Sequence, residues 1–102
     1  MRISVKELEE WFSEFNVKYF GGILPMPALS VGMSRTRLGS MSWRRTKKMF
    51  RTRTEYTIRI SNYYDMDSKA FKSVLLHEMI HLLIEYKRLK GYFPSEHGPY
   101  QR

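Results

Sequence analysis

A His-Glu-x-x-His pattern, formed by His77, Glu78 and His81, lies inside the otherwise apolar run 74–84. In a helix of about 3.6 residues per turn, residues four apart lie one above the other, so both imidazoles can bind a single ion. Glu78 is rotated by about 100° from His77, which places its carboxylate beside that ion, where it can accept a proton from water. The pattern therefore predicts a helix that carries two ligands of a tetrahedral zinc site and a general base.

The apolar run leaves this helix almost no solvated face, so we expect the helix to be buried on nearly all sides. Buried histidines and carboxylates need partners or a metal, which favours the zinc site. Two alternatives remain open. The histidines could lie on a solvated face, with Glu78 paired to a lysine, or they could be core residues satisfied by hydrogen bonds without a metal.

A catalytic zinc site needs a third protein ligand and an open position for water. Glu85 continues the i, i+4 spacing, but it lies about 12 Å along the helix axis from His77, too far for both to bind one ion. His97 follows an expected helix end at Gly91, in a turn-rich segment that can fold back along the helix. We predict His97 as the third ligand, with Glu96 as its rival.

The motif and the later sequence His97-Gly98-Pro99 together resemble the SprT-like domain. This domain is the zinc metallopeptidase module shared by bacterial SprT proteins and the eukaryotic DNA-protein crosslink protease Spartan. The segments 15–16, 19–22 and 24–25 (FN, YFGG and LP) resemble that family's opening helix and its exit. The resemblance implies that the zinc ligands are His77, His81 and His97, and that Glu78 is the catalytic carboxylate.

Two features depart from the family pattern. After the segment 97–99 the family usually continues with an acidic residue, an aromatic residue and a further helix, whereas this chain has Tyr100-Gln101-Arg102. The cysteine-rich zinc ribbon of many bacterial relatives is also not found, since the sequence contains no cysteine. We therefore expect a domain that lacks the usual C-terminal extension.

The length of 102 residues predicts a single domain over residues 1–102. No apolar run approaches the roughly 20 residues of a membrane span, and the N-terminus has no secretory hydrophobic region. The lack of cysteine fits a reducing compartment. We expect a cytoplasmic protein without a membrane partner.

The first element is predicted as a helix that begins after Ser4, because Ser4 and Glu7 have the spacing of a capping box. It should end at Gly21-Gly22. Its apolar residues follow a helical spacing and are expected in the core: Leu8, Trp11, Phe12, Phe15 and Tyr19. Asn16 either braces the helix exit through backbone hydrogen bonds or is simply exposed.

Alternating and β-branched residues predict strands over 28–34, 38–45 and 56–61, and the motif helix should cover 68–90 with Asp65 or Asp67 as its cap. The fold class is α+β: an N-terminal helix, a small three-stranded sheet that we expect to be antiparallel, and the buried motif helix. By the family resemblance the arrangement is zincin-like, and segment 39–42 is the expected edge strand beside the metal, where an extended peptide can pair.

Residues 15–54 contain nine lysines and arginines and no acidic residue, in a chain of net charge +8. Cations neutralise phosphates and aromatic rings stack on unpaired bases, so the basic 35–59 region is a candidate DNA-binding surface. A solvated flexible hairpin or an acidic protein partner are the alternatives. The candidate nucleic-acid residues are Arg44, Arg45, Lys47, Lys48, Arg51 and Arg53.

The sequence thus predicts a zinc-dependent endopeptidase that acts on protein or peptide substrates. The Spartan resemblance adds that these substrates could be bound or crosslinked to DNA. The alternative is a non-catalytic, zinc-containing module that binds nucleic acid or protein.

Overall fold

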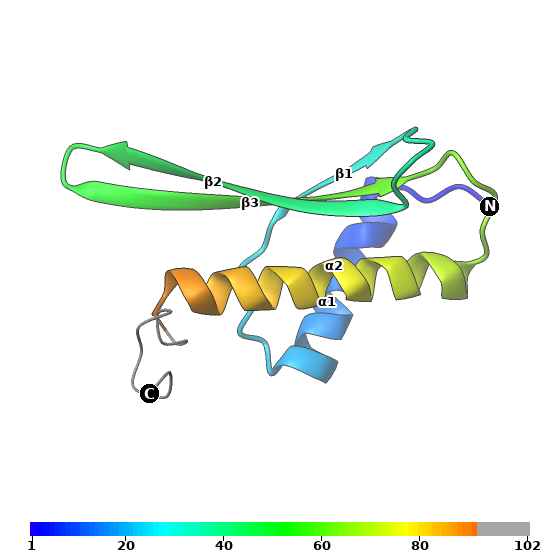
Figure 1. Cartoon of the computed structure of the whole chain (residues 1–102). Helices are drawn as coiled ribbons and strands as arrows, with labels where there is room; N and C mark the ends of the chain where they lie inside the picture. The colour runs from blue at the N-terminus through cyan, green and yellow to red at the C-terminus, as the bar shows by residue number, and fades with distance from the viewer. Residues whose placement is uncertain (92–102) are drawn as a thin grey trace, which may run out of the picture.

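Two helices cover one face of a three-stranded sheet in the computed structural model, which describes residues 1–91 (Figure 1). The elements in chain order are α1 (Val5–Phe20), β1 (Ala28–Gly32), β2 (Gly39–Lys48), β3 (Arg51–Ser61) and α2 (Ser68–Leu89). The predicted α+β class and order of elements are confirmed. Strands β2 and β3 are longer than predicted, because the basic stretch between them continues the hairpin.

The sheet is mixed, so the prediction of an antiparallel sheet is wrong. Its order is β1-β3-β2, with β2 and β3 antiparallel and β1 parallel to β3. Strand β3 takes the central position, where it is hydrogen-bonded on both edges and buries Tyr56, Ile58 and Ile60. Segment 33–38 connects β1 to β2 across the end of β3. Among the described strands, β2 is therefore an edge strand.

Helix α1 begins as predicted. The Ser4 hydroxyl accepts a hydrogen bond from the Glu7 amide at 3.1 Å, and the Glu7 carboxylate accepts one from the Ser4 amide at 3.1 Å. Gly21 ends the helix in the left-handed conformation, with φ of 63°. The buried stripe stops at Phe15, and the expectation that Tyr19 is a core residue is wrong, since it is 54% exposed. Its ring instead lies on the rim of the core, 5.7 Å from the Phe15 ring centroid.

Two asparagines fasten chain segments to the core. The Asn16 side chain donates a hydrogen bond to the Leu24 carbonyl at 3.0 Å and accepts one from the Leu24 amide at 3.1 Å, so the predicted brace is confirmed. Asn62 makes the same pair of bonds to the backbone of Ile3, at 2.8 and 2.9 Å. Each side chain thereby satisfies two backbone groups that lie outside regular structure.

Helix α2 is capped by Asp67, whose carboxylate accepts a hydrogen bond from the Ala70 amide at 2.8 Å. The other candidate cap, Asp65, pairs instead with the N-terminal ammonium group. The expectation of burial on nearly all sides is wrong, because the sheet and α1 cover only one side and leave Ile80 and Ile84 exposed. The fully buried residues of α2 form one stripe: Phe71, Leu75, Met79 and Leu82.

None of the helices described within residues 1–91 has the length and apolar character needed to cross a membrane.

The Asn16 brace predicts a measurable loss of stability in Asn16→Ala, because two partly buried backbone groups of Leu24 lose their partners. We expect the free energy of unfolding, measured by urea denaturation, to fall by about 1–3 kcal/mol. The matched control is Glu14→Ala, an exposed position on the same helix, which should stay within about 0.5 kcal/mol of the unchanged protein. Equal stability of the two variants would contradict this role of Asn16.

Candidate metal centre

His77 and His81 lie one turn apart on the exposed side of α2 that borders β2, as their spacing predicts. Their Nε2 atoms are 3.1 Å apart, and the ring planes are inclined by 82°. The two nitrogens therefore converge on one point outside the helix. This is the arrangement required of two ligands that share an ion.

The separation of the two nitrogens can be compared with zinc geometry. With zinc–nitrogen bonds of about 2.0–2.1 Å and a tetrahedral angle, two imidazole nitrogens lie roughly 3.4 Å apart. The observed 3.1 Å is close to this value, so a small rotamer adjustment admits the ion. The same separation also suits a hydrogen bond between two neutral imidazoles, which is one way to hold the pair together before metal enters.

Glu78 lies between the two histidines in sequence but points toward the sheet, where its side chain is only 6% exposed. Its carboxylate nevertheless reaches the same hollow as the two imidazoles. Within residues 1–91 no fully buried side-chain oxygen lacks a hydrogen-bond partner, and the Glu78 oxygens, to which no described group donates, therefore keep access to the groove. A largely buried carboxylate whose free side faces the groove beside the two imidazoles suits a general base.

The close approach of β2 to α2 holds Glu78 in this place. Gly39 begins β2 directly over the helix, and a Cβ atom there would lie 2.8 Å from Val74 Cγ1 and 3.1 Å from Glu78 Oε2. Only a glycine allows the strand to come this near, so the edge strand and the motif helix form one wall around the carboxylate.

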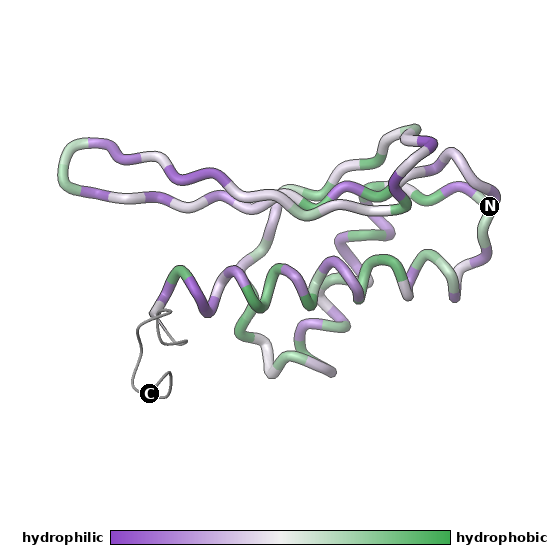
Figure 2. Tube along the Cα trace, viewed as in Figure 1, coloured by the Kyte–Doolittle hydropathy of each residue, from purple (hydrophilic) through white to green (hydrophobic). Residues whose placement is uncertain are grey.

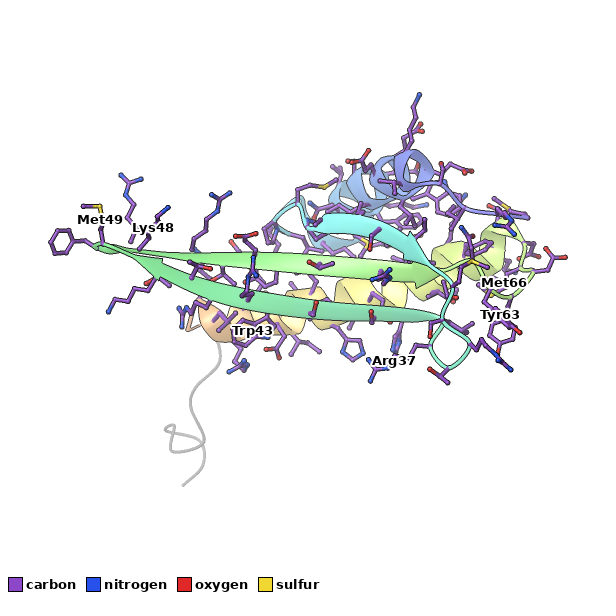
Figure 3. All side chains as sticks on the ribbon, turned by 90° about the horizontal axis from the view of Figure 1, so that it is seen from above. Arg37, Trp43, Lys48, Met49, Tyr63 and Met66 are labelled. Atoms are coloured by element: carbon purple, nitrogen blue, oxygen red, sulfur yellow. The ribbon has the colours of Figure 1, made fainter. Side chains whose placement is uncertain are left out.

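The hollow is an open groove of about 700 Å³ between β2 and α2. Its lining residues come from the loop before β2, from β2 and from α2: Arg37, Gly39, Ser40, Met41, Ser42, Trp43, His77, Glu78, His81 and Glu85. Arg37, from the loop before β2, and Trp43, from β2 itself, lie on the side of β2 away from β3 (Figure 3). The predicted edge strand at 39–42 therefore does lie beside the histidine pair.

Glu85, which its distance along the helix excludes as a ligand, closes the Trp43 end of the groove. Its carboxylate accepts hydrogen bonds from the Arg88 guanidinium at 2.6 and 3.1 Å, and this interaction holds the pKa of Glu85 below its usual value. The same guanidinium lies over the Trp43 ring, 5.8 Å from its centroid. The ion pair thus packs the indole against the end of the helix.

The predicted third ligand, His97, and its rival Glu96 lie outside the described residues. Within residues 1–91, no group of three or more histidine, cysteine or acidic side chains is placed to hold a metal ion. Sequence reasoning missed the contributions of Arg37 and Trp43 to the groove. Both lie inside the basic 35–59 region, which the sequence indicated only as a candidate DNA-binding surface, and the one signal for the groove was their proximity to the expected edge strand.

The six candidate nucleic-acid residues all lie exposed on the β2–β3 hairpin, but they divide between its two faces. Strand residues alternate between faces, and Tyr56, Ile58 and Ile60 mark the face toward the helices. Arg45 and Lys47 share that helix-side face through their pairing with Thr54 and Thr52. The opposite face, which we call the outer face, carries Arg44, Lys48, Arg51, Arg53 and also Arg59.

The contact at Gly39 predicts that Gly39→Ala destabilises the protein and displaces Glu78, because the added methyl group meets Val74 and the carboxylate. We expect urea denaturation to register a loss of about 1–3 kcal/mol, as for overpacking elsewhere. Ser42→Ala, on the same strand where the side chain is exposed, is the control and should be near neutral. A Gly39→Ala protein as stable as the control would show that the strand and helix are not tightly packed.

Comparison with known proteins identifies a family. The sequence profile of the SprT-like family matches residues 8–100, a range that contains the three strands, α2 and all the predicted ligands. No curated protein and no solved structure shows significant similarity to the chain. The match covers nearly the whole sequence and confirms the resemblance noted from the motif residues. The chain belongs to the SprT-like family.

Proposed function

We propose that this protein is a zinc-dependent endopeptidase, with its active site in the groove between β2 and α2. The observation that carries the proposal is the convergence of the His77 and His81 Nε2 atoms, 3.1 Å apart, beside the enclosed Glu78 carboxylate. Membership of the SprT-like family supports the proposal, because resemblance to this family implies a metallopeptidase. The two described histidines and His97 would hold the metal.

In this proposal the substrate binds along the free edge of β2. An extended peptide that enters the groove can pair with this strand through main-chain hydrogen bonds, as in other cases of strand addition. The scissile bond then lies between the strand and the two histidines. Because main-chain bonding is independent of side chains, we expect binding of many sequences, modulated at the groove ends by Arg37 and by Trp43 with Glu85.

Zinc, when bound, supplies a Lewis acid that polarises a carbonyl group and lowers the pKa of water. Glu78 accepts a proton from the water molecule whose oxygen attacks the carbonyl carbon of the scissile bond. As the carbon–nitrogen bond breaks, the protonated Glu78 donates this proton to the leaving amine nitrogen. Val74 and the backbone at Gly39 keep the carboxylate in a fixed position throughout, so little reorganisation is needed.

The basic β2–β3 hairpin is the part of the molecule that would determine where the enzyme works. The basic hairpin is exposed on both faces and lies apart from the groove floor, so it can hold phosphates while the groove holds a peptide. We propose that it brings the enzyme to DNA, where the substrates are proteins bound or crosslinked to the nucleic acid. This binding should weaken with salt and depend little on base sequence.

The proposed metal site predicts that the protein contains zinc. Purified protein should contain about one zinc per chain by mass spectrometry, and His77→Ala or His81→Ala should lose most of it. The exposed Ser73→Ala, one turn earlier on α2, is the control and should keep the metal. Circular dichroism should show all three variants folded, because the histidines are exposed and make no core contacts. Full zinc content in both histidine variants would exclude this site.

Glu78→Gln tests the chemistry separately from the metal. The amide keeps the size of the side chain but accepts no proton, so zinc content should be unchanged while peptide cleavage falls by at least about 100-fold. Cleavage is measured with a quenched fluorescent peptide library and with casein, using Ser42→Ala as a groove control. Undiminished cleavage by Glu78→Gln would contradict the mechanism. Zinc binding without cleavage by the unchanged protein would instead support the non-catalytic zinc-containing module.

A further inference from the structure

The β2–β3 hairpin extends well past the end of α2, so its distal part lies beyond the helical layer (Figure 1). Every residue from Trp43 to Arg53 is exposed. A two-stranded ribbon without a packed face is marginally stable by itself, and beyond Trp43, which packs against Arg88, none of these residues joins the core formed by the described residues. The core described within residues 1–91 therefore gives no reason for the length of the hairpin, which points to a use outside the molecule.

The tip of this ribbon is apolar although its flanks are charged (Figure 2). Pairing of Lys48 with Arg51 leaves a two-residue turn, in which Met49 is 88% exposed and Phe50 is fully exposed. Such turns favour glycine or asparagine, yet Met49 adopts a φ of 55°, a conformation that L side chains rarely take. Figure 3 shows Met49 projecting from the end of the ribbon beside Lys48. The tip thus keeps large apolar groups where folding favours small ones.

The outer face behind the tip carries cations at regular intervals. Arg51 and Arg53 lie two residues apart on β3, about 7 Å along the strand, and Lys48 lies opposite Arg51. Successive phosphates of an extended single strand have a comparable spacing. Four of the six cations within residues 44–53 are arginines, whose planar guanidinium groups bind phosphate through two hydrogen bonds and stack on bases.

We propose that the hairpin tip is a base-stacking element, which makes the hairpin selective for single-stranded or locally unpaired DNA. In this arrangement the Phe50 ring stacks on an unpaired base, Met49 contacts its edge, and the arginines and lysines of the two flanking strands bind the adjacent phosphates. This inference rests on the proposed DNA association and adds to it a structural class of DNA. Intact duplex offers the same phosphates but hides the base faces, so it loses the stacking contact.

An anionic membrane surface has the same charge, and we favour DNA over it for two reasons. The apolar tip has only two side chains, much less hydrocarbon than stable membrane anchoring requires. Beyond Arg53 the outer face carries Arg44 beside Glu55 and then Arg59, so cations recur away from the tip, which suits a linear phosphate backbone better than a surface touched at one end.

The test is fluorescence anisotropy with the full chain, at low salt, using a labelled 20-nucleotide single strand of mixed sequence and the blunt duplex of the same sequence. Anionic phosphatidylserine vesicles form a third probe, followed by sedimentation. The variants are Phe50→Ser and the double variant Arg51→Ala/Arg53→Ala. Val17→Ser on α1 is the matched control for loss of an exposed apolar side chain. All substituted residues are exposed, so the variants should fold.

We expect the unchanged protein and Val17→Ser to bind the single strand several-fold more tightly than the duplex. Phe50→Ser should weaken single-strand binding by about 10-fold, leave duplex binding nearly unchanged, and keep the same salt dependence. The double arginine variant should weaken both DNA forms and reduce the slope of log affinity against log salt by roughly 2.

Equal binding of both DNA forms, unchanged by Phe50→Ser, would overturn the stacking role and leave the proposed DNA association standing. Binding to neither form at low salt would overturn both. Tighter binding to the vesicles than to the single strand, lost in Phe50→Ser, would assign the tip to a membrane surface and also overturn the proposal. Peptide cleavage by the groove is measured separately, so none of these results depends on it.

Discussion

The close packing of β2 on α2 at Gly39 is the contact on which the proposed active site depends. It brings the free edge of a sheet within van der Waals distance of the helix that carries both histidines, and it encloses the Glu78 carboxylate. A bulkier residue at this position would separate the strand from the helix. The groove between them would then lose the relation between a peptide-binding edge and a general base that peptide hydrolysis requires.

The mixed sheet explains how three strands can offer both a groove and a projecting hairpin. Because β1 joins the far edge of β3, β2 pairs along only one edge with the strands described within residues 1–91. Near the core this edge faces the histidine pair, and farther out the same strand continues into the basic hairpin. A protein held on DNA by the hairpin would therefore lie close to the groove, which is the geometric basis of the proposed function.

The sequence predicted the helices and the histidine pair well, because local patterns determine them. The capping box at Ser4, the i, i+4 spacing of the histidines and the Asp67 cap depend only on neighbouring residues. Strand order depends on pairing between distant segments, so the parallel β1–β3 pairing and the roles of Gly39 and Trp43 could not be read from any local pattern. One-sided burial of α2 was also missed, since hydropathy gives no information about which neighbours are present.

X-ray absorption spectroscopy at the zinc edge, on the purified protein and its His97→Ala variant, is the most direct test of the central claim. We expect three imidazole nitrogens and one further oxygen around zinc at about 2.0–2.1 Å, with one imidazole fewer in the variant. A zinc ion with fewer than three imidazoles in the unchanged protein, or an identical spectrum in the variant, would contradict the three-histidine site.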